Sequence, residues 1–320
     1  MKKILCLALM FCVLFTGCKK ESSIFMAYQA EDSAVNTDIG SYIEAEVGDF
    51  KSKTLAVVTE EENNMANEMA SAIATMQVNN DTGEVLFANN VYDKIYPAST
   101  TKILTALVTL KYGNLADEVT FKEDNAGITT PGAKLCNYRA GDVVTIETLL
   151  GSLLVYSGND AAVAIAEHIS GSVEAFVDLM NEEAARLGAT STHFTNPHGL
   201  HDENHYTTAY DMYLIFRECI KYDKFREIVK MTSYRSEFKN ANGEDRYYRF
   251  ETTNLFLLGT RETPEGVTVY GGKTGSTGSA GDCLIIYSER EDGTGFVTAV
   301  FKASSKEDLY DQMTYLLSLE

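Results

Sequence analysis

The sequence predicts an α/β fold, more narrowly an α+β sandwich. In it, the N- and C-terminal parts form one antiparallel sheet flanked by helices, and an all-helical subdomain is inserted. Strand patterns at 72–78 and 84–88 are joined by the turn residues 79–83. Three further strand patterns follow residue 254, at 267–274, 282–288 and 295–302. Because helical periodicity fills the stretch between, the strands from the two ends must meet in one sheet.

The helices carry their own boundary signals. They are expected at 99–112, 145–155, 160–169, 173–187, 207–221 and 305–317. The first opens after Pro97, and its run of apolar residues predicts that it is mostly buried. Gly113, Gly171 and Gly188 stand where three of these helices should end.

Composition limits the classes of protein that this chain can be. Its 320 residues could hold one large domain or two ordinary ones, and 45% apolar residues suffice for a full core. A formal charge of −19 argues against a nucleic-acid partner, whose phosphates need lysine and arginine. It argues equally against an anionic membrane bound through a basic face.

Residues 1–18 predict a lipoprotein-type signal peptide rather than part of the fold. Lysines at 2–3 precede an apolar run, 4–15, that is too short to span a bilayer comfortably. Gly17 before Cys18 is similar to a bacterial lipobox, so we expect lipidation of Cys18 and membrane anchoring through that lipid. Simple secretion is the alternative, and either route places the domain outside the cytoplasmic membrane.

The segment 19–67 predicts an acidic flexible tether, because it is poor in aromatics and has no clear periodicity. Within it, residues 54–58 could form a short strand. The folded domain is then expected at 68–320, and nothing in the chain demands a partner subunit, so we expect a monomer.

Three cysteines remain after the signal segment and Cys18. Cys136, Cys219 and Cys283 lie far apart in apolar or mixed surroundings, which predicts buried free thiols, with one disulfide pair as the alternative. No cysteine and histidine spacing indicates a metal site, and we expect neither a metal nor another cofactor.

Three short motifs stand in order along the chain: Ser99-Thr100-Thr101-Lys102, Ser157-Gly158-Asn159 and Lys273-Thr274-Gly275. Ser-x-x-Lys alone is a weak signal, because it recurs at Ser236 and Lys239 in a polar stretch with no sign of a buried helix start. The three motifs together supply a serine with a lysine one helical turn away, a second hydroxyl with an amide, and a cation on a strand. This set predicts acyl transfer at an amide bond without a histidine triad.

The chemistry assigns a role to each side chain. Ser99 is the predicted nucleophile, and Lys102 is its base if burial and a nearby cation keep the amine neutral. Ser157 can relay the proton to the leaving amine. Asn159 can donate to a substrate carbonyl and hold Lys102, while Lys273 is the second cation, whose charge the substrate's carboxylate would keep.

The third motif lies on a predicted strand rich in small residues, along which a peptide could lie as an added strand. A nucleotide-binding P-loop is excluded, because it requires glycine at position 267, where valine stands. The oxyanion formed during acyl transfer needs two donors, for which the N–H groups of Ser99 and Ser276 are the candidates.

These motifs and their flanks resemble the serine-type D-alanyl-D-alanine carboxypeptidases among the low-molecular-mass penicillin-binding proteins, which have the β-lactamase/transpeptidase-like fold. The resemblance runs from about residue 70 to 317. The segments that carry it are Pro97–Leu107, Leu154–Ala162, Thr192–Leu200, His205–Asp211 and Gly272–Gly281.

The resemblance implies removal of the terminal D-alanine from peptidoglycan stem peptides through an acyl-Ser99 intermediate, with β-lactams as covalent inhibitors. It implies that Thr274 and Thr277 contact the substrate's terminal carboxylate. It also makes the histidines structural residues of a loop; these are His193, His198, His201 and His205.

Two departures from the family pattern stand out. Many members carry an arginine that clamps the terminal carboxylate, and here Leu309 occupies that position, with Lys306 as an imperfect substitute. Members often add a β-rich domain and a C-terminal amphipathic anchor, for which a lipid at Cys18 would be the replacement.

Three other functions compete with this interpretation. A serine β-lactamase shares the motifs but needs a glutamate-bearing loop, and this chain has Asn196-Pro197-His198-Gly199-Leu200 in the comparable stretch. An endopeptidase that cuts D-alanyl cross-links uses the same chemistry at an internal bond. A catalytically weak, penicillin-binding, wall-sensing lipoprotein would keep the pocket without turnover.

Overall fold

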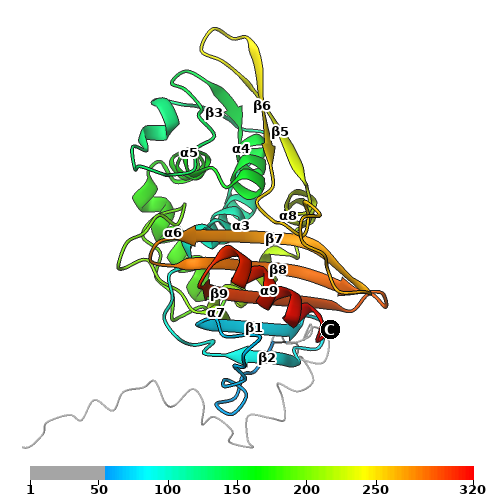
Figure 1. Cartoon of the computed structure of the whole chain (residues 1–320). Coiled ribbons are helices and arrows are strands. Elements are labelled where there is room, and N and C mark those ends of the chain that lie inside the picture. Colours follow the sequence, from blue (N-terminus) through cyan, green and yellow to red (C-terminus); the bar gives the residue numbers. More distant parts are fainter. Residues whose placement is uncertain (1–54) are drawn as a thin grey trace, which may run out of the picture. The chain divides into compact units, whose positions relative to one another are not determined.

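The computed structural model describes residues 55–320, and the expected signal segment with Cys18 lies outside them. A five-stranded antiparallel sheet has the order β2-β1-β9-β8-β7. Its strands are β1 (Ala74–Asn79), β2 (Val85–Asn89), β7 (Val267–Thr277), β8 (Gly281–Arg290) and β9 (Gly295–Ala303). Pairing of β1 with β9 confirms that the two ends of the ordered chain meet in one sheet, as Figure 1 shows.

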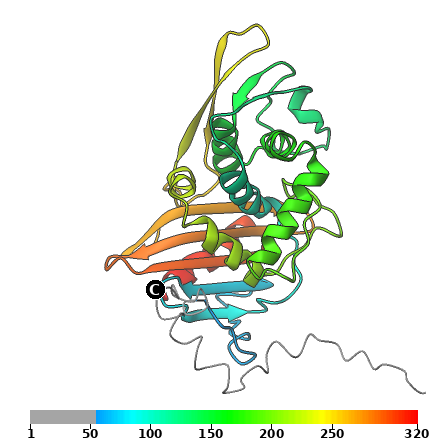
Figure 2. The same ribbon diagram turned by 180° about the vertical axis from the view of Figure 1, so that it is seen from behind.

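Helices cover both faces of this sheet. The C-terminal helix α9 (Lys306–Leu317) crosses one face in Figure 1, where its side chains pack on Leu284, Ile286 and Val300. Seen from behind in Figure 2, α7 (Ala209–Cys219) contacts β1 and β9 on the opposite face, and α3 (Lys102–Tyr112) packs on α7. Alternate residues of β8 thus enter different cores, as the two-residue repeat of a strand dictates.

The remaining helices form the part beside the sheet. They are α4 (Ile146–Gly151), the π-helical turn η4 (Ser152–Tyr156), α5 (Asn159–Ser170), α6 (Val173–Arg186) and α8 (Asp223–Val229). The single helix expected over 145–155 is therefore α4 followed by a π-turn. Two 3₁₀ turns, η2 (Ala98–Thr101) and η3 (Asp124–Gly127), complete the helical elements. No described helix is both long and apolar enough to cross a bilayer.

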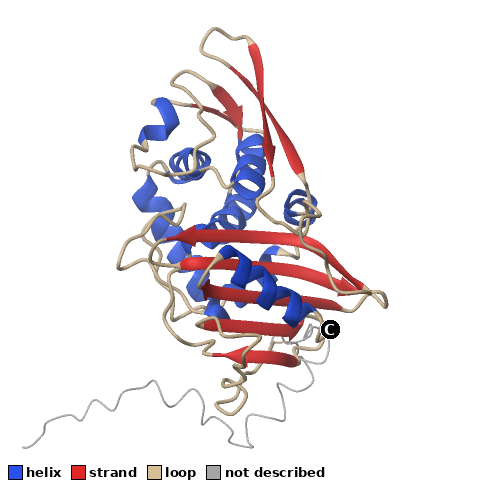
Figure 3. Cartoon of the chain, viewed as in Figure 1, coloured by secondary structure: helices blue, strands red, loops and turns tan. Residues whose placement is uncertain are grey.

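The inserted part is not all-helical, which corrects the sequence-based expectation. It contains a second antiparallel sheet, β3-β4-β5-β6, made of β3 (Glu118–Thr120), β4 (Val143–Thr145), β5 (Ser233–Lys239) and β6 (Asp245–Glu251). Figure 3 shows the long β5–β6 hairpin beside the helices. Most of its side chains are exposed or half-buried, so it lacks the apolar alternation that reveals a strand. The second Ser-x-x-Lys lies on β5.

The packed domain also begins earlier than residue 68. Residues 55–58 form no strand, yet Ala56 and Val58 are buried in the main core. The Tyr210 hydroxyl donates to the Ala56 carbonyl at 2.9 Å. At least residues 55–67 therefore belong to the fold rather than to a tether.

Candidate active site

The three motifs meet at one cavity of about 350 Å³ between the β7 edge of the main sheet and the helical part. Side chains or backbone of seven predicted site residues line it: Ser99, Ser157, Asn159, Thr274, Gly275, Ser276 and Thr277. Lys102 and Lys273 are buried behind this lining, with at most 1% of either residue exposed. The structure therefore brings together every predicted site residue within 55–320.

Ser99 lies on the 3₁₀ turn η2, directly before α3. The preceding residue, Ala98, has a φ of +47°, a left-handed conformation that costs free energy for any residue but glycine. The Thr100 hydroxyl donates to the Pro97 carbonyl at 2.6 Å, and the Thr101 hydroxyl donates to the Ala98 carbonyl at 2.8 Å. These two side chains hold the turn in the shape that presents Ser99 to the cavity.

The Lys102 amine is surrounded by oxygen atoms. Its Nζ lies 3.0 Å from Ser99 Oγ, 2.7 Å from Asn159 Oδ1 and 2.6 Å from the His198 carbonyl oxygen. The pKa of Lys102 is lowered to about 7, chiefly by burial and to a smaller extent by nearby Lys134, against the opposing effects of Cys136 and Asp160. A buried amine with this pKa is substantially neutral at physiological pH.

The second motif follows the π-turn η4. Ser157 has a φ of +76°, which ends that turn and directs the chain into α5 at Asn159. Gly158 is required by packing, because a Cβ there would lie 2.1 Å from Cys136 Sγ. Asp160 accepts the backbone N–H groups of Cys136 and Asn137 at 2.8 and 3.0 Å, which ties the 132–138 loop to the start of α5.

This loop adds a cation that sequence reasoning did not single out. Lys134 lines the cavity, its carbonyl accepts the Asn159 N–H at 2.8 Å, and its amine lies 4.3 Å from the centre of the Tyr156 ring. Sequence alone gave no signal for it, because the loop is far from the motifs along the chain.

Lys273 lies on β7 and faces the second motif. Its amine donates to Ser157 Oγ and to the Thr274 carbonyl, both at 2.9 Å. Burial holds the pKa of Lys273 well below its usual value, and the neighbouring Lys102 lowers it further. A Cβ on Gly275 would lie 2.9 Å from the Ser99 nitrogen, so only glycine lets β7 pass this close to Ser99.

The end of the cavity near α9 contains the two residues named above for the position of the expected arginine. Leu309 is buried in its wall, and Lys306, the first residue of α9, also lines it. Thr274 Oγ1 is paired with Thr253 Oγ1, a residue that the motifs did not indicate. Within the described residues, Lys306 forms no ion pair.

The histidines do not gather around a metal. Across residues 55–320, no cluster of three or more histidine, cysteine or acidic residues could hold an ion. His205 is buried and His198 is half-buried, and desolvation lowers the pKa of His198 to about 3 and that of His205 to about 4. Cys136, Cys219 and Cys283 are buried free thiols, as predicted, and no pair of them forms a disulfide.

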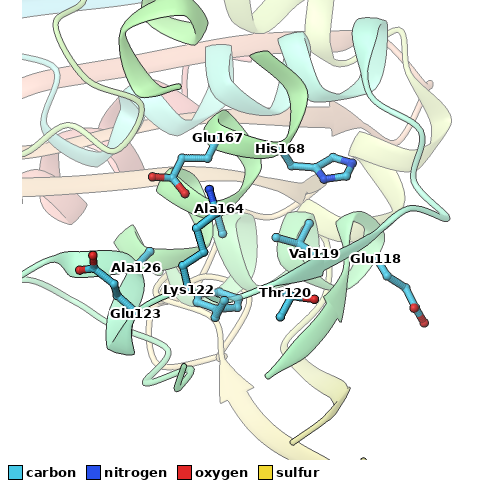
Figure 4. Close-up of a pocket in the computed structure, with 10 residues that line it drawn as sticks. Glu118, Val119, Thr120, Lys122, Glu123, Ala126, Ala164, Glu167 and His168 are labelled. Carbon is cyan, nitrogen blue, oxygen red and sulfur yellow. The ribbon is translucent and has the colours of Figure 1, made fainter. Parts of the chain in front are cut away.

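A second cavity of about 340 Å³ lies at the other end of α5, beside Glu167 and His168. Figure 4 shows it, with Lys122 from the segment after β3 reaching toward α5. It contains none of the motif residues. The candidate active site is therefore the cavity at the start of α5.

Comparison with known proteins confirms the family. The chain belongs to the D-alanyl-D-alanine carboxypeptidase family, whose model matches residues 59–305. It is 34% identical over 260 residues to D-alanyl-D-alanine carboxypeptidase DacF of Bacillus subtilis, covering 79% of this chain and 62% of that protein. It is 34% identical over 225 residues to DacA of Haemophilus influenzae, covering 69% and 54%. The chain thus spans less than two thirds of the length of either relative.

Solved structures agree on the fold. The Streptomyces K15 DD-transpeptidase superposes with a TM-score of 0.73 at 28% identity, covering 79% of this chain and 98% of that one. Penicillin binding protein 5 from Haemophilus influenzae gives a TM-score of 0.70 at 29% identity, covering 79% and 71%. The predicted fold class is confirmed.

Gly199→Ala should destabilise the site strongly. A Cβ there would lie 1.8 Å from the Ala98 carbonyl oxygen, and the φ of Gly199 is +86°. Gly171→Ala is the matched control, since its φ is +81° and a Cβ would meet nothing within 4 Å. We expect the control to lose about 1 kcal/mol of unfolding free energy and Gly199→Ala at least about 3 kcal/mol more, measured by denaturant unfolding. Equal losses of unfolding free energy in the two variants would show that position 199 requires glycine only for its backbone conformation, and not for close packing on Ala98.

Proposed function

We propose that this chain is a serine-type D-alanyl-D-alanine carboxypeptidase that binds penicillin. It would remove the terminal D-alanine from peptidoglycan stem peptides through an acyl-Ser99 intermediate. The observation that carries the proposal is the arrangement around the Lys102 amine. A neutral amine has two hydrogens and one lone pair, and Asn159 Oδ1 and the His198 carbonyl can each accept one hydrogen. The lone pair is then left for the hydroxyl of Ser99, 3.0 Å away.

The proton inventory of acylation follows from these contacts. Ser99 Oγ attacks the carbonyl carbon of the scissile amide while its proton passes to Lys102 Nζ. Ser157, whose Oγ accepts from the Lys273 amine at 2.9 Å, passes its own proton to the nitrogen of the departing D-alanine and takes up the one held by Lys102, so that the Lys102 amine is neutral again. The C–N bond breaks, the acyl group remains on Ser99, and a water molecule then releases it with the same base.

The backbone beside Ser99 supports this chemistry. In the part of the chain that the structure describes, the Ser99 N–H donates to no protein acceptor, although it lies next to Gly275 on β7. An unpaired N–H at this point suits an oxyanion donor, with the Ser276 N–H as its proposed partner. The substrate amide would lie along β7, with Asn159 donating to one of its carbonyls.

The lining of the cavity favours this function over a β-lactamase. Asp282 is the one acidic side chain that lines it among the described residues, and it lies on β8. The loop 196–200 contributes only Gly199 and Leu200 to the lining, and the Asn196 amide is bonded within the loop, where its Oδ1 accepts the Gly199 N–H at 2.7 Å. Without a glutamate to activate water, a penicilloyl group on Ser99 should be long-lived. An endopeptidase acting on cross-links is the second candidate, since this chain lacks the arginine that favours a free carboxylate.

We also propose that the domain works on the outer side of the cytoplasmic membrane, held by a lipid on Cys18. The lipobox-like sequence before Cys18 and the cell-wall substrate of the proposed reaction support this location. A monomer suffices for the reaction, because every proposed site residue comes from one chain.

The direct test of the function is release of free D-alanine from a stem pentapeptide ending in D-Ala-D-Ala. The full chain should release it, and Ser99→Ala should lower the rate by at least about 10³-fold, because the acyl intermediate cannot form. Ser236→Ala is the matched control, since it removes the serine of the other Ser-x-x-Lys, on β5. Release by Ser99→Ala at the wild-type rate would refute the proposal. Cleavage of cross-linked dimers only would favour the endopeptidase.

The rate of Ser99 acylation by penicillin should rise with pH and be half-maximal near the Lys102 pKa of about 7. Below that pH the amine carries a proton and cannot accept another. Lys134→Ala removes a charge that lowers this pKa, so the acidic limb of the pH–rate profile of this variant should move to higher pH. Lys224→Ala, whose amine pairs with Glu147 outside the cavity, should leave the limb unchanged. A rate independent of pH across this range would exclude Lys102 as the base.

Lys306 is the proposed partner of the substrate's terminal carboxylate in place of the missing arginine, together with Thr274 and Thr277. Lys306→Ala should raise KM about tenfold for a peptide with a free carboxylate, because a charge-assisted contact is lost. The KM of the C-terminally amidated peptide should not change. Lys239→Ala, paired with Asp245 on the distant hairpin, is the control. An equal rise for both peptides would show that Lys306 does not read the carboxylate.

A further inference from the structure

A chain of hydrogen bonds leads from a buried histidine to the peptide bond before Ser99. His205 Nδ1 accepts the backbone N–H of Thr195 at 3.0 Å, so this nitrogen carries no proton. His205 Nε2 lies 2.8 Å from Thr101 Oγ1, and the Thr101 hydroxyl already donates to the Ala98 carbonyl. The tautomer follows: Nε2 holds the proton and donates it to Thr101.

The end of this chain bears on Ser99 through covalent geometry. The Ala98 carbonyl and the Ser99 N–H belong to one planar trans peptide, so they point in opposite directions. Holding the carbonyl toward Thr101 therefore turns the Ser99 N–H the other way, toward β7. Gly199 confines the same carbonyl from another side, because its α-carbon packs where a Cβ would overlap that oxygen. The left-handed φ of Ala98 needs such constraints to persist.

We propose that His205 is a positioning residue for acyl transfer: acting through Thr101, it fixes the Ala98–Ser99 peptide so that the Ser99 N–H faces the developing oxyanion. This inference rests on the proposed function. Without this role, His205 would be only a buried residue of the fold. With it, His205 affects the Ser99 N–H, a backbone donor 106 positions earlier in the chain. His205 is not among the residues that line the cavity.

His205 is suited to this task because it stays neutral. Burial lowers its pKa to about 4; Lys102, His193 and His201 also disfavour its charged form, and Asp202 favours that form. The imidazole therefore remains one donor and one acceptor throughout the pH range in which Lys102 titrates. Its two contacts can be separated by substitution, because asparagine mimics Nδ1 and glutamine mimics Nε2.

The test compares His205→Gln with His205→Asn in the full chain. Glutamine can keep the donor to Thr101 and lose the acceptor for Thr195, whereas asparagine can keep the acceptor and lose the donor. We expect penicillin to acylate His205→Asn about tenfold more slowly than His205→Gln, with similar thermal unfolding midpoints for the two. The acidic limb of the pH profile should stay at the wild-type pH in both variants.

A second pair of variants tests the same hydrogen bond without changing His205, in case a His205 variant fails to fold. Thr101→Val removes the hydroxyl at constant shape and should be slow, while Thr101→Ser keeps it and should approach the wild-type rate. The inference would be overturned if the Gln and Asn variants were acylated equally fast, or if the Asn variant were faster. A displaced acidic limb of the pH–rate profile would also overturn it, because that result would place His205 in proton transfer. If penicillin does not acylate the wild-type protein, the proposed function itself fails. If it acylates the wild-type protein but the variants do not differ, only the inference about His205 fails.

Discussion

The site depends on one buried amine, that of Lys102. Three segments far apart in sequence converge on it: the turn of Ser99, the start of α5 at Asn159, and the loop that contains His198. A charged lysine with no carboxylate in contact is costly to bury, so the protein resolves the conflict by lowering the pKa to about 7. The desolvation that destabilises the charged form is thus also what would make the amine a base.

Left-handed backbone at two non-glycine residues accompanies this arrangement. Ala98 precedes Ser99, and Ser157 ends the π-turn η4, with φ values of +47° and +76°. Contacts hold both residues in a backbone conformation that they do not intrinsically prefer. Thr101 and Gly199 hold the Ala98 carbonyl, and the Lys273 amine holds Ser157. Two of the seven non-glycine residues with positive φ among residues 55–320 are thus Ser157 itself and the residue before Ser99, where the surrounding structure must determine the backbone fully.

The sequence was informative where chemistry requires particular residues at fixed spacing. The three motifs, their convergence, and the pairing of N- and C-terminal strands could all be predicted from residue order. The β5–β6 hairpin could not, because its strands bury few side chains and so show no apolar alternation. The packing of Ala56 and Val58 was missed because two small apolar side chains in an acidic segment give no periodic signal. The hydrogen bond between Thr101 and His205 joins residues 104 positions apart and has no local pattern.

The loop around residues 195–205 explains why Ser-x-x-Lys alone is a weak indicator of function. Its His198 carbonyl orients the Lys102 amine, its Gly199 confines the Ala98 carbonyl, and its His205 bonds to Thr101 within the motif itself. The same four-residue pattern at Ser236 lies on a strand, where i and i+3 side chains point to opposite faces. A serine and a lysine become a reactive pair only when a helix places them on one side and a second segment supplies acceptors for the amine. The information for that second segment is carried almost a hundred residues downstream, so the motif and its loop must be considered together.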